Sequence, residues 1–152
     1  MRYLNTLTHT NTQTHKHTNT QMGLFSAFKK DTSSNQSKKT NTFPWIDLTS
    51  TDQLIEVQEQ SKTQPVVIFK HSTRCVISRM VLREFESSFP KDQHSVSLYF
   101  LDLLAYRDIS NEIGSKFQVS HQSPQLIVLK NGEAVYHASH NDINAKAIKE
   151  FI

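Results

Sequence analysis

The side chain in this sequence best suited to covalent chemistry is Cys75, the single cysteine among 152 residues. Arg74 precedes it directly, and Lys70 and His71 lie a few positions earlier. A cysteine reacts as its thiolate, and nearby cations together with a helix N-terminus stabilise that anion. We therefore expect Cys75 to be a reactive thiol whose negative charge is supported by Arg74. The alternative is a small buried side chain without chemistry, which is common for free cysteine.

Ser78 occupies the position of the second cysteine in a C-x-x-C pair. A hydroxyl cannot resolve a mixed disulfide, so a disulfide formed on Cys75 has to wait for an outside thiol. One cysteine also excludes an internal disulfide and a cysteine-built zinc site. The sequence therefore predicts monothiol exchange or a binding module without turnover. The Ser78 hydroxyl either hydrogen-bonds the thiolate or is an ordinary serine of a first helical turn.

Two elements have to position the cysteine. Residues 66–69 form a continuous apolar run, which is typical of a strand buried on both faces of a sheet. Beyond Cys75, apolar residues recur at every fourth position as far as Pro90, which predicts an amphipathic helix. These apolar residues are Ile77, Val81, Phe85 and Phe89. Cys75 is therefore expected at the first turn of a helix that follows a buried strand.

The rest of the chain from Phe43 alternates between strand and helix patterns. Ser50 with Gln53 is a capping-box signal, and Asn131-Gly132 suits a type I′ hairpin turn. The order predicts an α/β domain whose central mixed sheet is parallel in its first half, antiparallel in its C-terminal hairpin and flanked by helices. In chain order we expect a strand at 45–48, a helix from Ser50, a strand at 96–101, a helix at 109–117, strands at 126–129 and 134–136, and a last helix at 143–151.

The first 42 residues differ from this pattern. A Thr/His/Asn-rich motif at 9–13 recurs at 17–21 with almost no apolar side chains, and residues 29–42 are again polar. Such segments cannot bury enough surface to fold, so we expect a disordered tail and linker at 1–42 and one domain at 43–152. Met22 opens a more ordinary sequence and is the expected start. His15 and His17 are a poor metal site on such a segment, and no metal is predicted.

Composition argues against several classes of partner. The formal charge of +3 and the pI near 9.0 are mild, and the basic residues are scattered among acidic ones. We therefore expect neither nucleic acid nor a membrane as partner. The apolar runs are too short for a transmembrane helix or an export signal. A cytoplasmic location is expected, which suits a free thiol.

The domain resembles the YtxJ family, described as bacillithiol-system redox-active proteins or monothiol bacilliredoxins. The resemblance covers roughly residues 22–152 and rests on three segments, at 70–78, at 101–113 and at 121–125. Their sequences are KHSTRCVIS, LDL followed by YRDISNEI, and HQSPQ. A proline commonly follows the active cysteine in relatives, whereas Val76 does so here. Together with the order of elements, the resemblance implies a thioredoxin-like fold, in which Ser123-Pro124 would be a cis bond facing Cys75.

The resemblance also implies a function. The Cys75 thiolate would attack the bacillithiol sulfur of a mixed disulfide, release the protein thiol and keep bacillithiol until a second thiol frees it. Bacillithiol would be a co-substrate, with no tightly bound cofactor, although the same cysteine would serve glutathione or coenzyme A. The expected partners of this monomer are S-thiolated proteins and low-molecular-weight thiols. Its expected catalytic residues are Cys75, Ser78 and Arg74, and its expected substrate-binding residues are Thr73, Ser123 and Pro124.

Other interpretations remain open at this stage. His121, near the predicted cis bond, is either a proton donor or a plain loop histidine. A redox-silent adaptor would bind a partner peptide along the Ser123-Pro124 edge. An iron-sulfur carrier like the monothiol glutaredoxins would share a cluster between two chains through Cys75 and an external thiol.

Overall fold

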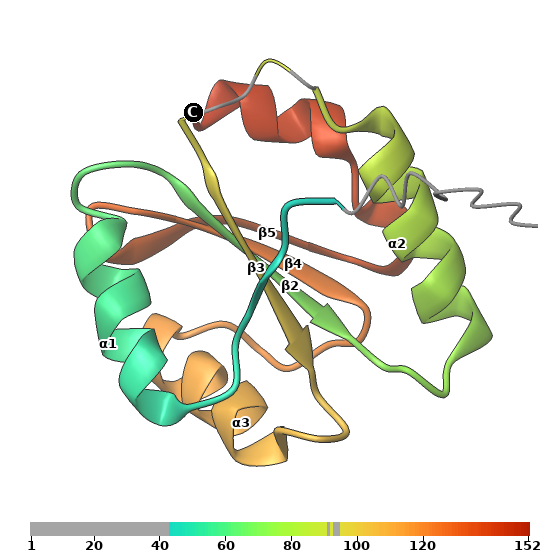
Figure 1. The fold of residues 1–152 in the computed structure, drawn as a ribbon, viewed down its shortest axis with the longest axis horizontal. Coiled ribbons are helices and arrows are strands. Elements are labelled where there is room, and N and C mark those ends of the chain that lie inside the picture. Colours follow the sequence, from blue (N-terminus) through green and yellow to red (C-terminus); the bar gives the residue numbers. More distant parts are fainter. Residues whose placement is uncertain (1–42, 91, 93–94) are drawn as a thin grey trace, which may run out of the picture. The chain divides into compact units, whose positions relative to one another are not determined.

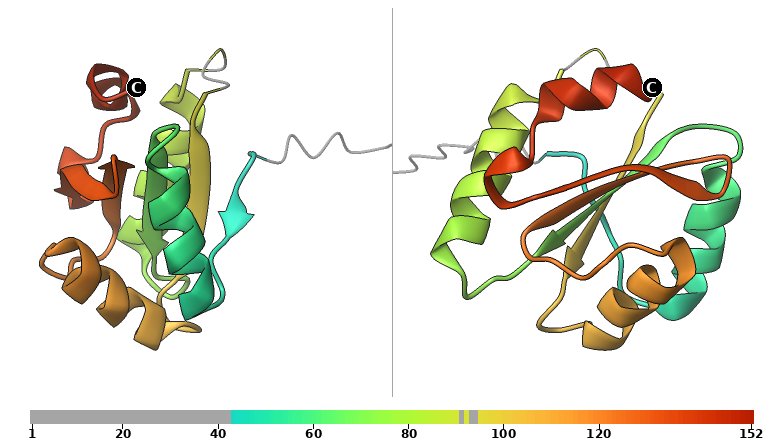
Figure 2. Two further views of the ribbon diagram at one scale, coloured as in Figure 1. Left: turned by 90° about the vertical axis from the view of Figure 1, so that its left-hand side faces the viewer. Right: turned by 180° about the vertical axis from the view of Figure 1, so that it is seen from behind.

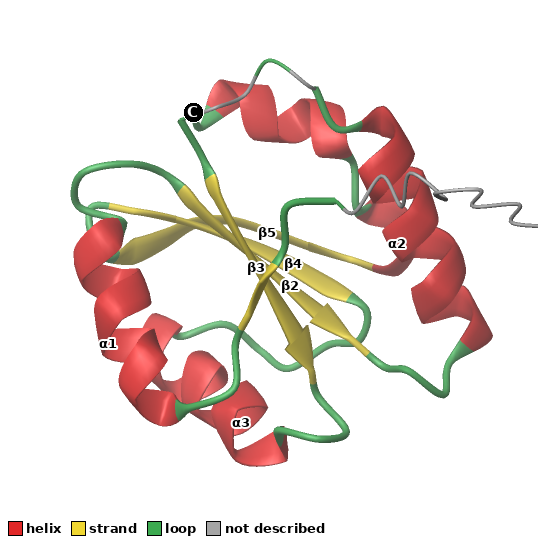
Figure 3. Cartoon of the chain, viewed as in Figure 1, coloured by secondary structure: helices red, strands yellow, loops and turns green. Residues whose placement is uncertain are grey.

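A computed structural model describes residues 43–90, 92 and 95–152 of the chain. The predicted tail and linker, the start at Met22 and the pair His15 and His17 all lie outside the described residues. The elements, shown in Figures 1 and 3, are β1 Ile46–Asp47, α1 Thr51–Gln60, β2 Val66–His71, α2 Val76–Ser88, β3 Ser97–Asp102, α3 Arg107–Phe117, β4 Gln125–Lys130, β5 Glu133–Ser139, and the 3-10 helices η1 His140–Asp142 and η2 Ala145–Glu150.

The strands form a mixed sheet in the order β1-β3-β2-β4-β5. β1, β3 and β2 are parallel to one another, β4 is antiparallel to β2, and β5 is antiparallel to β4. The predicted α/β fold, with its parallel first half and antiparallel hairpin, is therefore confirmed. In the turn between β4 and β5, Asn131 and Gly132 have φ of 55° and 84°. Two positive φ angles are what a type I′ turn requires.

Helices cover both faces of the sheet. Figures 1 and 2 show α1 and α3 side by side against one face, and α2 with the C-terminal 3-10 turns against the other. Two hydrophobic cores result, one on each face. Since side chains alternate along a strand, β2 sends Val66 and Ile68 into the first core and Val67 and Phe69 into the second. β2 is buried over its whole length, as its apolar run predicts.

The inner face of α2 differs from the prediction at the first turn. Ile77 is 52% exposed, whereas Ser78 is fully buried. Phe85 is buried too, and Ser78 lies seven residues before it, close to two whole helical turns. Ile77 lies eight residues before Phe85, which places it about 80° further round the helix. The predicted four-residue spacing of apolar side chains therefore names Ile77 as the inward-facing residue two turns before Phe85, whereas the buried residue there is Ser78.

The last helix also differs from its prediction. It begins at Ala145, and η2 is a 3-10 helix. Ala145 and Ile148 are buried, and Phe151 packs against the same core. These three residues are three positions apart, which matches the three residues per turn of a 3-10 helix.

Ser50 caps α1 with the predicted capping box to Gln53. In the described part of the chain, no helix combines the length and the hydropathy that crossing a bilayer requires.

Candidate functional site

Cys75 lies at the junction between β2 and α2. It is the N-cap residue of α2, has an extended backbone (φ −95°, ψ 123°) and is partly exposed. Its N–H donates to the Ser72 carbonyl at 3.1 Å, and the Arg79 N–H donates to the Cys75 carbonyl at 3.2 Å. The prediction that the cysteine sits at the start of a helix after a buried strand is confirmed.

This position gives the sulfur a favourable environment for negative charge. The first N–H groups of a helix have no partner within it, and they carry the positive end of the helix dipole. The Cys75 side chain does not cap them by a hydrogen bond. An anion at the start of α2 is therefore stabilised by the backbone itself, as anions at helix N-termini generally are.

Exposed arginines lie on both sides of the cysteine. Arg74 and Thr73 are exposed in the loop, and Arg79 donates from Nη1 to the Thr73 carbonyl at 3.4 Å. Arg79 was not among the expected site residues. Its position four residues after Cys75 is the available signal, because that spacing brings two side chains to one face of a helix.

The Ser78 hydroxyl has partners that the sequence did not indicate. Ser78 is buried, its Oγ accepts a hydrogen bond from the Ser72 N–H at 3.0 Å, and it is hydrogen-bonded to Nδ1 of His71 at 2.9 Å. Ser78 is therefore neither a plain first-turn serine nor bonded to the Cys75 sulfur in this structure. It ties the start of α2 to the end of β2 and to the loop that carries Cys75.

His71 does not supply the positive charge expected beside the cysteine. It is buried with its ring centroid 5.4 Å from that of Phe100. Burial lowers the pKa of His71 below its usual value, and Arg79 lowers it further, against the opposing effects of Asp102 and Glu86. The imidazole is therefore neutral near pH 7. Its role at the site is to accept or donate a hydrogen bond with Ser78.

Lys70 lies in a separate polar cluster with α3. Its side chain is fully buried, and its Nζ is hydrogen-bonded to Nδ1 of His121 at 3.0 Å. Ser110 of α3 is buried as well, with its Oγ 3.3 Å from the same nitrogen. Burial lowers the pKa of Lys70 from 10.5 to about 8. The pKa of His121 is lowered as well, most by burial and then by the charges of Lys70 and Arg107.

The Ser123-Pro124 bond is cis, as predicted. It directly precedes Gln125 of β4, which pairs with Lys70 of β2. The bond therefore lies at the same edge of the sheet as the β2–α2 junction. The Ser123 Oγ is buried and has no hydrogen-bond partner among the described residues. Contact between Pro124 and Cys75 stays a prediction.

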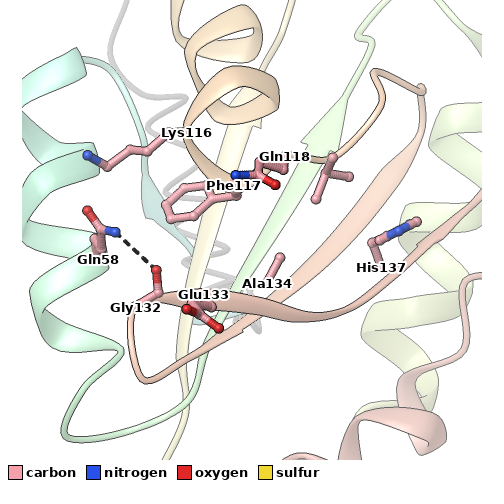
Figure 4. Close-up of a pocket in the computed structure, with 9 residues that line it drawn as sticks. Gln58, Lys116, Phe117, Gln118, Gly132, Glu133, Ala134 and His137 are labelled. Carbon is pink, nitrogen blue, oxygen red and sulfur yellow. Dashed lines mark hydrogen bonds between the residues drawn. The ribbon is translucent and has the colours of Figure 1, made fainter.

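A hollow of about 540 Å³ lies away from this edge, and none of the expected site residues lines it (Figure 4). Its walls come from α1, the end of α3 and the β4–β5 hairpin, and Gln58 donates to the Gly132 carbonyl across it at 3.0 Å. The hairpin turn follows the end of β4 that pairs with the start of β2. Cys75 therefore does not line this hollow.

The buried ammonium of Lys70 makes stability depend on pH. The pKa of Lys70 is about 8 in the folded protein and near 10.5 in the unfolded chain, so the unfolded chain binds more protons between these values. The free energy of unfolding should therefore rise with pH across this range, by on the order of 2–3 kcal/mol. Urea unfolding at pH 8 and pH 10 should show wild type gaining stability relative to Lys70→Met.

Lys62→Met is the matched control, because Lys62 pairs with Glu59 and both side chains are largely exposed. This variant should follow the wild-type dependence on pH. Parallel curves for wild type and Lys70→Met would show that Lys70 is not a buried cation.

Comparisons with known proteins agree with the fold described above. The family model described as monothiol bacilliredoxin BrxC matches residues 46–148, from β1 to η2. A solved structure described as an oxidoreductase with a thioredoxin fold is 34% identical, with a TM-score of 0.61 over 70% of this chain and 92% of that one.

Two thioredoxins share the fold at lower identity. The thioredoxin of Trypanosoma brucei brucei is 21% identical, with a TM-score of 0.53 over 71% of this chain and 88% of that one. The thioredoxin of Fasciola hepatica is also 21% identical, with a TM-score of 0.51 over 70% of this chain and 94% of that one.

Proposed function

The chain belongs to the monothiol bacilliredoxin BrxC family, and we propose that it removes a low-molecular-weight thiol from protein mixed disulfides through Cys75. A thiol redox function follows from the family itself. The observation that carries the finer proposal is the position of Cys75, partly exposed at the N-cap of α2 with Ser78 in the place of a resolving thiol. Chemistry at this sulfur has to begin and end with thiols of other molecules.

The reaction consists of two exchanges. The Cys75 thiolate attacks the low-molecular-weight sulfur of the mixed disulfide, the disulfide bond of the substrate breaks, and the protein leaves as a thiolate that takes up a proton. Cys75 then holds the small thiol in a new disulfide. A second small thiolate attacks that small-thiol sulfur, forms a symmetrical disulfide and restores the Cys75 thiolate. The substrate protein thus regains its free thiol, and Cys75 ends in its reduced state.

Bacillithiol is the small thiol we propose, on the strength of the family name, and it acts as a co-substrate. Arg74 adds positive charge beside the sulfur, while Thr73 and the backbone of Ser123-Pro124 contact the bound thiol compound. S-thiolated proteins are the partners of this reaction. The cytoplasm is its proposed location, because thiols stay reduced there.

Intact mass spectrometry tests the transfer. Wild type incubated with a bacillithiolated peptide should gain the mass of one bacillithiol, because Cys75 accepts it and Ser78 cannot displace it. Cys75→Ser should gain nothing. A glutathionylated peptide run in parallel should transfer more slowly if bacillithiol is the preferred thiol. An unmodified wild type in both reactions would contradict the proposal and favour a redox-silent adaptor.

The Ser78→Cys variant tests the monothiol character. Its added thiol should attack the Cys75 mixed disulfide, release bacillithiol and leave an internal disulfide two hydrogens lighter than the reduced chain. The same mass measurement reads both states. Ser87→Cys is the control, because Ser87 is exposed near the far end of α2 and should leave the adduct in place. Persistence of the adduct in Ser78→Cys would contradict the assigned geometry.

A further inference from the structure

The polar cluster of Lys70, Ser110 and His121 has no part in the exchange described above. Its members come from β2, from α3 and from the loop before β4, so only the fold brings them together. Lys70 is fully buried, yet its ammonium has no carboxylate among its hydrogen-bond partners in the described residues; its bond there is to Nδ1 of His121. A lysine kept in such a place needs an explanation, because burying an unpaired ammonium is costly.

Lys70 fixes the protonation of the His121 ring. An ammonium group only donates hydrogen bonds, so Nδ1 of His121 has to accept. A neutral imidazole that accepts at Nδ1 carries its proton at Nε2. His121 is exposed, and Nε2 lies on the side of the ring away from Nδ1. The cluster therefore presents an N–H donor toward solvent, backed by a buried proton source.

The location of the cluster links it to the exchange reaction. Lys70 pairs across the sheet with Gln125, the residue directly after Ser123-Pro124. The Gln125 side chain is buried, donates to the Ser120 carbonyl at 2.8 Å and accepts from the Gln122 N–H at 3.3 Å, which holds the loop around His121 in place. His121 thus stands at the edge of the sheet where the proposed substrate backbone contacts lie.

We propose that Lys70 holds His121 as its Nε2–H tautomer, and that this pair delivers the proton taken up by the thiolate that leaves when Cys75 accepts the small thiol. This inference rests on the proposed function and deepens it. His121 is the catalytic acid and Lys70 its positioning residue and proton source.

The proton transfer balances with the solvent as the final proton source. The leaving thiolate takes the Nε2 proton of His121 and becomes a thiol, while Lys70 passes one ammonium proton to Nδ1. Lys70 ends as a neutral amine and His121 as the Nδ1–H tautomer. A proton from the bulk solvent (hydronium or buffer acid) then returns to Nε2, and the Nδ1 proton moves back to Lys70.

The acidity of the proton source suits this task. Burial lowers the pKa of Lys70 to about 8, close to the value of roughly 8.5 for an ordinary thiol. Proton transfer between groups of similar pKa near the working pH is the favourable case for acid catalysis. Arg107 is the other charged group acting on His121, and it also keeps the imidazole neutral.

A comparison of leaving groups tests the proposal. Bacillithiol mixed disulfides with an aryl thiol and with an alkyl thiol differ in the basicity of the thiolate that leaves, and the more basic one needs the proton. His121→Asn and Lys70→Met should slow transfer from the alkyl disulfide by about tenfold or more while leaving the aryl rate nearly unchanged. His137→Asn and Lys62→Met, both at exposed positions, are the matched controls.

The ratio of the two rates also depends on pH in a defined way. In wild type the alkyl-to-aryl rate ratio should fall as pH rises through about 8, where Lys70 loses its proton. The amount of attacking thiolate cancels in this ratio, because both substrates react with the same sulfur. In the Lys70→Met variant, the alkyl-to-aryl rate ratio should stay the same as pH rises through about 8.

The ring tautomer gives a readout that needs no variant. Nitrogen-15 NMR of wild type at pH 7 should show His121 protonated at Nε2 and bare at Nδ1. A protonated Nδ1, or equal slowing of alkyl and aryl transfer in both variants, would overturn the relay. Failure of wild type to react with either disulfide would instead overturn the proposed function.

Discussion

The structure around Cys75 depends on one buried hydroxyl. Ser78 is hydrogen-bonded to the Ser72 N–H and to His71, so the first turn of α2 is tied to the last residue of β2. This fixes the loop between them, with Cys75 as the N-cap residue. The backbone N–H groups that support a thiolate are placed by this junction, and the exposed arginines add to it. A resolving cysteine at position 78 would remove that hydroxyl.

β2 delivers different chemistry to its two faces. His71 faces the junction with α2, while Lys70, one position earlier, is hydrogen-bonded to His121 on the α3 side, where Ser110 contacts the same ring nitrogen. Both groups are buried, and burial lowers the pKa of each. The strand thus holds a neutral imidazole at the junction that carries Cys75 and an ammonium of lowered pKa beside His121, in the loop before Ser123-Pro124. In the proposed reaction, one face supports attack and the other supplies the proton for departure.

Local patterns predict what depends on neighbours in the sequence. The apolar run of β2, the capping box at Ser50 and the Asn131-Gly132 turn each report their own backbone, and all three hold in the structure. The partners of Lys70 and Ser78 could not be predicted in this way. Lys70 and His121 are 51 positions apart, and the inward place of Ser78 depends on the phase of α2 over two turns. Such contacts carry no signal in a single sequence.

The most direct test of the Ser78 junction is the rate at which iodoacetamide alkylates Cys75 at pH 7. Only the thiolate reacts, so the rate reports how well the start of α2 supports it. The Ser78→Ala variant should react several-fold more slowly than wild type, because the junction is loosened. Ser87→Ala, which removes an exposed hydroxyl from the same helix, should react like wild type. Equal rates for all three proteins would contradict the account.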